Sequence, residues 1–198
     1  MSPLRTAIWR FTFAYGLLIA PWPGFSLAYA RCFRALGQIV FASETECRLL
    51  RFEPVPQNLH HTLDTRIVLI NRNQLDRNGC GPVMYLELST RSLGWTPTAL
   101  VVALVLATPG SLKRRGWSLL AAVLAIHGFI LFSVAIYIWN SSLGLSLVAL
   151  GPLSRQIMAG LDETLVAQMG ASFVAPVVIW MAIAIGDEKM MRPLFARP

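Results

Sequence analysis

The sequence predicts an α-helical integral membrane protein with four transmembrane helices and a small β-rich insert between the first and second. Of its 198 residues, 55% are hydrophobic and 14% are charged, and the mean hydropathy is +0.57. These values lie outside the range of soluble globular proteins. The apolar residues gather in long runs, which favours membrane spans over a soluble core. Residues 43–94 are the one long polar region, which predicts a single extramembrane insert.

The run from Trp95 to Leu112 is the most readable span. It contains no charged residue, and at about 1.5 Å per residue it would reach about 27 Å, close to the thickness of a bilayer's hydrocarbon core. Lys113-Arg114-Arg115 follows it. Short cytoplasmic loops collect Lys and Arg, so we expect this basic turn, residues 113–115, to be cytoplasmic.

The first span is expected from Ala7 to Trp22, where prolines end the helix. A signal peptide would have a similar apolar run, but Pro21-Trp22-Pro23-Gly24 lacks the small residues that processing prefers. We therefore expect a retained anchor. The third and fourth spans are expected at Trp117–Trp139 and Met169–Ile185. For residues 140–168 two alternatives stay open, a bent continuation of the third helix or a loop with a short surface helix.

These spans divide the chain into three parts. Residues 1–24 would be a cytoplasmic N-terminus and the first span, residues 25–94 an amphipathic helix with a strand-rich extracytoplasmic domain, and residues 95–198 a three-helix region with a cytoplasmic tail. Basic residues are concentrated in the segments that this topology places inside. The expected location is a bacterial inner membrane, with several spans and both termini cytoplasmic.

Residues Phe25–Ala42 have the pattern of an amphipathic helix. Arg31, Arg34 and Gln38 fall on a different face from the apolar residues Phe25, Tyr29, Cys32, Phe33, Leu36, Ile39 and Val40. The apolar face could lie in the membrane interface or pack on the domain that follows. The pattern does not decide between these two.

Three segments of the polar region have strand length and are rich in apolar or β-branched residues: Cys47–Glu53, Asp64–Asn71 and Pro82–Leu88. Prolines follow the first segment, and Asp76-Arg77-Asn78-Gly79 separates the second from the third. A three-stranded meander covered by the amphipathic helix is therefore expected.

Several side chains of the insert could carry chemistry. Cys47 and Cys80 could form a disulfide in an oxidising compartment, or remain two thiols. Cys80 could instead act as a nucleophile if His60 or His61 served as its base. The adjacent histidines lack the spacing of a paired metal site, so no metal is expected.

Two further places attract attention. Ser89, Thr90 and Arg91 lie where the insert enters the second span. His127 is the only His, Asp, Glu, Lys or Arg side chain of the third span. Such a group is often functional, although a neutral imidazole bonded to a neighbouring helix is the simpler interpretation.

The run from Leu86 to Leu120, LELSTRSLGWTPTALVVALVLATPGSLKRRGWSLL, resembles the segment of exosortase and archaeosortase membrane transpeptidases where an outside-facing site leads into a span. Those enzymes have a nucleophilic cysteine here, where this chain has Ser89 or Thr90. The wider layout, with FAYGLLIAPWPG and STRSLGWTPTA, is more similar to the small membrane proteins that accompany exosortases in Gram-negative bacteria. The resemblance implies an accessory role in protein sorting or surface-polymer export, beside another inner-membrane protein.

Two functions follow as expectations. The first is a non-enzymatic inner-membrane accessory protein of an exosortase-type system, which contacts its partner through the insert and the spans. The alternative is a divergent membrane-embedded transpeptidase or hydrolase that uses Cys80, or Ser89 and Thr90 with Arg91, at the mouth of the second span. The sequence has no phosphate-binding loop, dinucleotide fingerprint or metalloprotease motif, so no cofactor is expected. The positive charge of +7 falls beside apolar runs and argues for lipid headgroups over nucleic acid.

Overall fold

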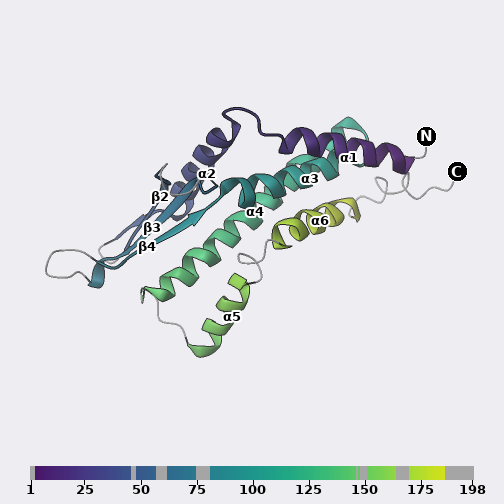
Figure 1. The fold of residues 1–198 in the computed structure, drawn as a ribbon. Coiled ribbons are helices and arrows are strands. Elements are labelled where there is room, and N and C mark those ends of the chain that lie inside the picture. The colour runs from purple at the N-terminus through teal and green to yellow at the C-terminus, as the bar shows by residue number, and fades with distance from the viewer. Residues whose placement is uncertain are drawn as a thin grey trace. The chain divides into compact units, whose positions relative to one another are not determined.

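The structure is a computed structural model that describes residues 3–45, 48–56, 62–74, 81–145, 147, 151–163 and 170–185. These residues are mostly helical and include one small antiparallel sheet (Figure 1), which agrees with the predicted fold class in outline. The chain divides into two compact units. The helical unit comprises Met1–Trp22, Gly94–Ile130 and Met169–Pro198, and the sheet unit comprises Pro23–Leu93 and Leu131–Gln168.

The sheet has four antiparallel strands in the order β1-β2-β3-β4. The strands are β1 (Ser43–Glu44), β2 (Arg48–Pro54), β3 (Thr65–Asn71) and β4 (Val83–Leu88). The predicted meander is thus confirmed for β2, β3 and β4. The two-residue strand β1, which pairs with β2 at the edge of the sheet, is too short to leave a pattern in the sequence.

One face of the sheet forms the core of its unit. Leu50 lies opposite Leu69, and Phe52 lies opposite Ile67; all four side chains are buried. Helix α2 (Phe25–Phe41) packs on this face through Ala30, Phe33 and Gly37. A Cβ on Gly37 would lie 2.6 Å from the Phe52 ring, so the close approach of helix and strand requires glycine at this position.

The buried face of α2 differs from the predicted one. Gln38 Oε1 accepts a hydrogen bond from the Phe52 backbone N–H (3.0 Å), and Arg34 Nη1 donates to the Asp64 carbonyl (2.9 Å). Ile39, by contrast, is 83% exposed. Small residues let the backbone of α2 approach the sheet, and the polar side chains then bond to strand groups. Packing on the domain is therefore observed, and Phe33 of the predicted apolar face takes part in it, while Leu36, Ile39 and Val40 of that face stay exposed in the described part of the chain.

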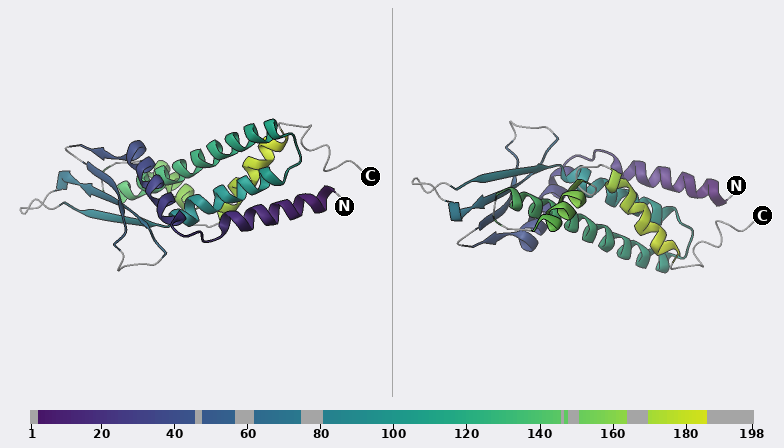
Figure 2. Two further views of the ribbon diagram at one scale, coloured as in Figure 1. Left: turned by 90° about the horizontal axis from the view of Figure 1, so that it is seen from above. Right: turned by 90° about the horizontal axis from the view of Figure 1, so that it is seen from below.

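The helical unit contains four apolar helical segments. They are α1 (Pro3–Ile19), α3 (Thr96–Ala107), residues 112–130 of α4 (Leu112–Gly144) and α6 (Gly170–Ile185). Helix α3 contacts both α1 and α6, and the three run beside one another in both views of Figure 2. Trp95 Nε1 donates to the Leu18 carbonyl, and Trp180 Nε1 donates to Thr108 Oγ1, each at 2.9 Å.

The four predicted spans are not supported by helix length. Within the described residues, one helix, Leu112–Gly144, is long and apolar enough to cross a membrane. The second predicted span, Trp95–Leu112, is not one helix: α3 ends at Ala107, because Pro109 and Gly110 interrupt the apolar run. The basic residues 113–115 consequently begin α4 and do not form a turn of their own.

Helix α4 also extends beyond the third predicted span. It continues to Gly144, and a short separate helix, α5 (Pro152–Asp162), follows. The described part of residues 140–168 thus combines the two alternatives: the third helix continues to Gly144, and a separate short helix follows. From Leu131 onward α4 belongs to the sheet unit, where Asn71 Nδ2 donates to the Leu145 carbonyl just after the end of the helix (2.8 Å).

Candidate functional site

Thr90, one of the predicted site residues, is held by a carboxylate. Its hydroxyl donates to Asp64 Oδ2 (2.7 Å), and its backbone N–H donates to Asp64 Oδ1 (3.1 Å). The residue is 1% exposed, so a substrate has no access to the hydroxyl in this conformation. The pair has the geometry of a helix cap, in which a carboxylate satisfies the first free N–H groups of the helix that follows.

The neighbouring predicted residues do not join Thr90 in a catalytic arrangement. Ser89 Oγ accepts weak hydrogen bonds from the backbone N–H and hydroxyl of Ser92, both at 3.4 Å. These contacts occur where residues Arg91–Trp95 form a π-helical turn before α3. Arg91 is exposed. Activating a hydroxyl nucleophile needs a base beside it, and the contacts of Ser89 supply only another hydroxyl and a backbone N–H.

Arg34 of α2 also binds to Asp64. Its Nη1 contacts the Asp64 carbonyl at 2.9 Å and Thr65 Oγ1 at 3.4 Å. Sequence reasoning missed Arg34 because it assigned the residue to the solvent face of its helix. The signal was the spacing of the small residues Ala30 and Gly37, which mark the packed face. We call Asp64, Thr90 and Arg34 the Asp64 junction. Its hydrogen bonds hold α2, the start of β3 and the end of β4 together, and its role is structural.

The remaining predicted residues are accounted for as follows. Cys47, Cys80, His60 and His61 lie outside the described residues, so the disulfide and the Cys80 nucleophile are not tested. Cys32, expected to be an apolar filler, is an exposed free thiol. Nδ1 of His127 lies 2.9 Å from the Val123 carbonyl, one turn earlier in its own helix. The described residues contain no group of three His, Cys, Asp or Glu side chains that could hold a metal ion.

The face of the sheet opposite α2 carries charged side chains that form ion pairs with one another. Glu44 forms ion pairs with Arg51 and Arg72, each at 3.1 Å. Hydrogen bonds from Arg51 and then Arg72 lower the pKa of the Glu44 carboxyl below its ordinary value of 4.5. Arg66 pairs with Glu87 and lies over the Tyr85 ring, 4.8 Å from its centroid. Glu87 balances Arg66, and Glu44 is shared by two arginines, so each named arginine of this face already has a carboxylate partner.

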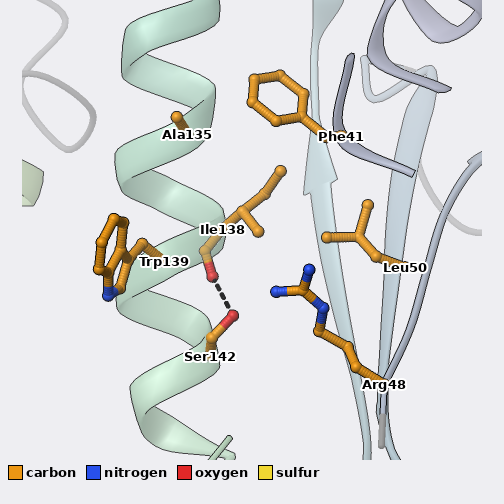
Figure 3. Close-up of a pocket in the computed structure, with 7 residues that line it drawn as sticks. All are labelled: Phe41, Arg48, Leu50, Ala135, Ile138, Trp139 and Ser142. Carbon is orange, nitrogen blue, oxygen red and sulfur yellow. Dashed lines mark hydrogen bonds between the residues drawn. The ribbon is translucent and has the colours of Figure 1, made fainter. Parts of the chain in front are cut away.

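A different set of residues lines a pocket on the covered face of the sheet. The pocket has a volume of about 370 Å³ and lies between β2 and the last turns of α4 (Figure 3). Arg48 is its charged residue. Nothing in the local sequence sets Arg48 apart from the other arginines of the insert. No local pattern shows the pocket, because its walls come from segments about ninety residues apart, residues 41–50 and 135–142.

Comparisons of the chain with protein-family models, with curated proteins and with solved structures found no match. The resemblance to exosortase-associated membrane proteins therefore stays a prediction, and the function has to be argued from the two units.

Proposed function

We propose that this chain is a non-enzymatic accessory protein of the bacterial inner membrane. In this proposal the short helices α1, α3 and α6 and the first part of the long helix α4 form four spans with both termini in the cytoplasm, and the sheet unit lies outside. The partner would be another inner-membrane protein. The resemblance of residues 86–120 suggests a machine of the exosortase type, for protein sorting or surface-polymer export.

One observation carries the proposal: the outward faces of the helical unit bear large apolar side chains. Phe13 is 73% exposed, Trp117 is 67% exposed and Leu124 is 64% exposed. Further exposed side chains on α1 and α6 are Leu4, Ile8, Trp9, Leu17, Phe173, Val174 and Val178. Exposed apolar surface over several helices at once marks a membrane or protein contact.

The small residues in the interior of the helical unit also favour a lipid environment. Ala99, Ala103, Ala122 and Ala184 are buried there, and small residues between helices are typical of membrane bundles, where close backbone approach replaces the hydrophobic effect. Helix α1 has 17 residues, which at about 1.5 Å per residue reach about 25 Å, near the lower limit for a span. Short spans of this kind fit a bilayer that thins around them.

The uncovered stripe of α2 supports the accessory role. Leu36, Ile39 and Val40 are exposed on the side of α2 away from the sheet. This stripe is suited to the membrane interface or to a helix of the partner.

The contacts of Thr90 support an accessory over an enzyme. Its hydroxyl proton is directed to Asp64 and the residue is buried, which is the arrangement of a cap. We expect Ser89→Ala and Arg91→Ala to leave the cellular phenotype and the co-purified partner unchanged. Thr90→Ala should lower the amount of folded protein, with function falling in proportion, and Thr90→Ser should restore both. Loss of function at full abundance in any of the three alanine variants would instead favour the transpeptidase or hydrolase alternative.

The topology has its own test. In a variant with all three cysteines changed to serine, Arg51→Cys and Lys113→Cys are introduced one at a time. Both residues are exposed. A maleimide that does not cross membranes should label Arg51→Cys in intact spheroplasts and Lys113→Cys only after lysis. Equal labelling of both before lysis would refute the proposed membrane arrangement.

A further inference from the structure

The pocket between β2 and α4 has apolar walls and a cation at one end. Its apolar walls are Phe41, Leu50, Ala135, Ile138 and Trp139. Figure 3 shows the Phe41 ring and Ala135 toward one end, and the Arg48 guanidinium beside Ser142 toward the other. The volume of about 370 Å³ falls within the range of small-molecule sites, near its lower limit.

From this arrangement we propose that the pocket binds an anionic amphiphile, a single apolar chain that ends in a carboxylate or a phosphate. Arg48 would bind the anionic group, and the apolar walls would hold the chain. All the lining residues belong to the sheet unit, so this inference does not depend on the proposed membrane role.

Within the described residues, Arg48 differs from the other arginines of the sheet in having no counter-charge. Arg51 and Arg72 pair with Glu44, and Arg66 pairs with Glu87. The side chain of Arg48 has no hydrogen bond or ion pair with the part of the chain that the structure describes, although the residue is half-buried. A partly desolvated cation is unfavourable unless an anion accompanies it.

The position of Arg48 on its strand explains this difference. Side chains alternate between the two faces of a strand, so Arg48 and Leu50 point to the covered face while Arg51 points to the charged face with Glu44. Figure 3 shows the Arg48 guanidinium directed into the space between β2 and α4.

The polar groups at this end of the pocket select an anion. The guanidinium offers a planar fork of N–H donors that matches the two oxygens of a carboxylate or phosphate. Ser142 does not compete for the anion, because its hydroxyl donates to the Ile138 carbonyl at 2.7 Å. A neutral chain of the same length would fill the apolar walls and leave Arg48 without a partner.

The test uses the full chain in phosphatidylcholine nanodiscs and the quenching of tryptophan fluorescence by dodecanoate brominated at its terminal carbon. We expect a saturable component, which Trp139→Phe removes because Trp139 lines the pocket. Arg48→Gln should raise the midpoint of saturation about tenfold or more, as expected for loss of a charged hydrogen bond. The matched control is Arg51→Gln, on the same strand but the opposite face, which should leave the midpoint unchanged.

Further variants and ligands identify the preferred head group, and a folding control excludes misfolding as the cause of lost binding. Ala135→Phe keeps the cation but fills the pocket, and it should abolish saturation. Brominated dodecyl phosphate identifies the preferred head group by its midpoint relative to dodecanoate, and saturation by either one that depends on Arg48 supports the proposal. Circular dichroism confirms that each variant is folded, and Arg48→Lys, which keeps the charge without the fork, should give an intermediate midpoint. An unchanged midpoint in Arg48→Gln, or saturation by brominated dodecanol at the same concentration, would overturn the proposal.

Discussion

The helical unit and the sheet unit both bury large apolar side chains, such as Val101 and Ile67, but they differ in how many alanines are buried and in what their outer faces carry. In the helical unit alanines such as Ala99 and Ala103 are buried, while Phe13 and Leu124 are exposed. In the sheet unit large apolar side chains such as Ile67 and Leu69 are fully buried, and ion pairs cover the face opposite α2. The sheet unit follows the rule for proteins in water, and the helical unit follows the pattern expected of helices surrounded by lipid.

This difference is what the proposed membrane role predicts, with the helical unit in lipid and the sheet unit in water. A polar network of Asp64, Thr90 and Arg34 stabilises the sheet unit, because the buried donors of Thr90 would otherwise have no acceptor. The described interhelical hydrogen bonds of the helical unit include two from tryptophan indoles, Trp95 and Trp180. Substitutions that exchange the character of the two surfaces are therefore the sharpest way to break the comparison.

The largest effect is expected from a charge on the outward face of α4. Leu124→Arg should make the apparent free energy of membrane insertion about 3 kcal/mol less favourable, because a cation near the bilayer centre is costly. The amount of protein in the membrane should fall as a result. The measurement is the fraction of full-length protein that stays in the membrane after carbonate extraction.

Its control places the same charge on the outward face of the sheet. Val83 is 41% exposed, and Val83→Arg should change stability by less than about 0.5 kcal/mol, as is usual at a solvent-facing position. If the two variants behaved alike, the contrast between the units would be wrong.

A medium effect is expected at the Asp64 junction of the sheet unit. Asp64→Ala removes the acceptor for the Thr90 hydroxyl and N–H, and the buried donors left behind should cost about 2 kcal/mol of unfolding free energy. Asp64→Asn retains one acceptor oxygen and should cost about half as much. Urea unfolding followed by circular dichroism measures both; equal losses would mean that the carboxylate acts by charge alone.

The smallest effect concerns the ion pairs of Glu44. Because Arg51 and Arg72 lower the pKa of Glu44, its contribution to folding is fully present above pH 4.5 and is lost as the pH falls through the lowered pKa. The unfolding temperatures of the wild type and Glu44→Gln should differ slightly at neutral pH, since surface pairs contribute little, and converge in acid. A difference that grew in acid would contradict this sign.

Much of the local structure could be predicted from the sequence. The strand-length segments became β2, β3 and β4, because alternation and turn residues are local properties. The helices also lie where the apolar runs predicted them, and residues 21–24 end α1 as expected. Span length was overestimated where Pro109 and Gly110 shorten α3.

What could not be predicted depends on contacts between distant segments. Gly37 against Phe52 and the bonds of Arg34 and Gln38 decide which face of α2 is buried. Hydrophobicity alone favoured a neighbouring face that shares only part of the buried one. The Asp64 cap joins residues 26 positions apart. The Arg48 pocket needs both β2 and α4, so no window of sequence contains it.

The bond between Asn71 and Leu145 joins residues 74 positions apart, and this separation sets an order of assembly during synthesis. The meander of β2, β3 and β4 can pair as soon as it leaves the ribosome, since its contacts are local. At about 5–20 residues per second, the end of α4 emerges about 3–11 s after the end of β4. Until then the covered face of the sheet lacks this wall, and the Arg48 pocket is the last part of the unit to close. A nascent chain arrested between these points would expose Leu50 to chaperones, and a pause in translation there would prolong that exposure.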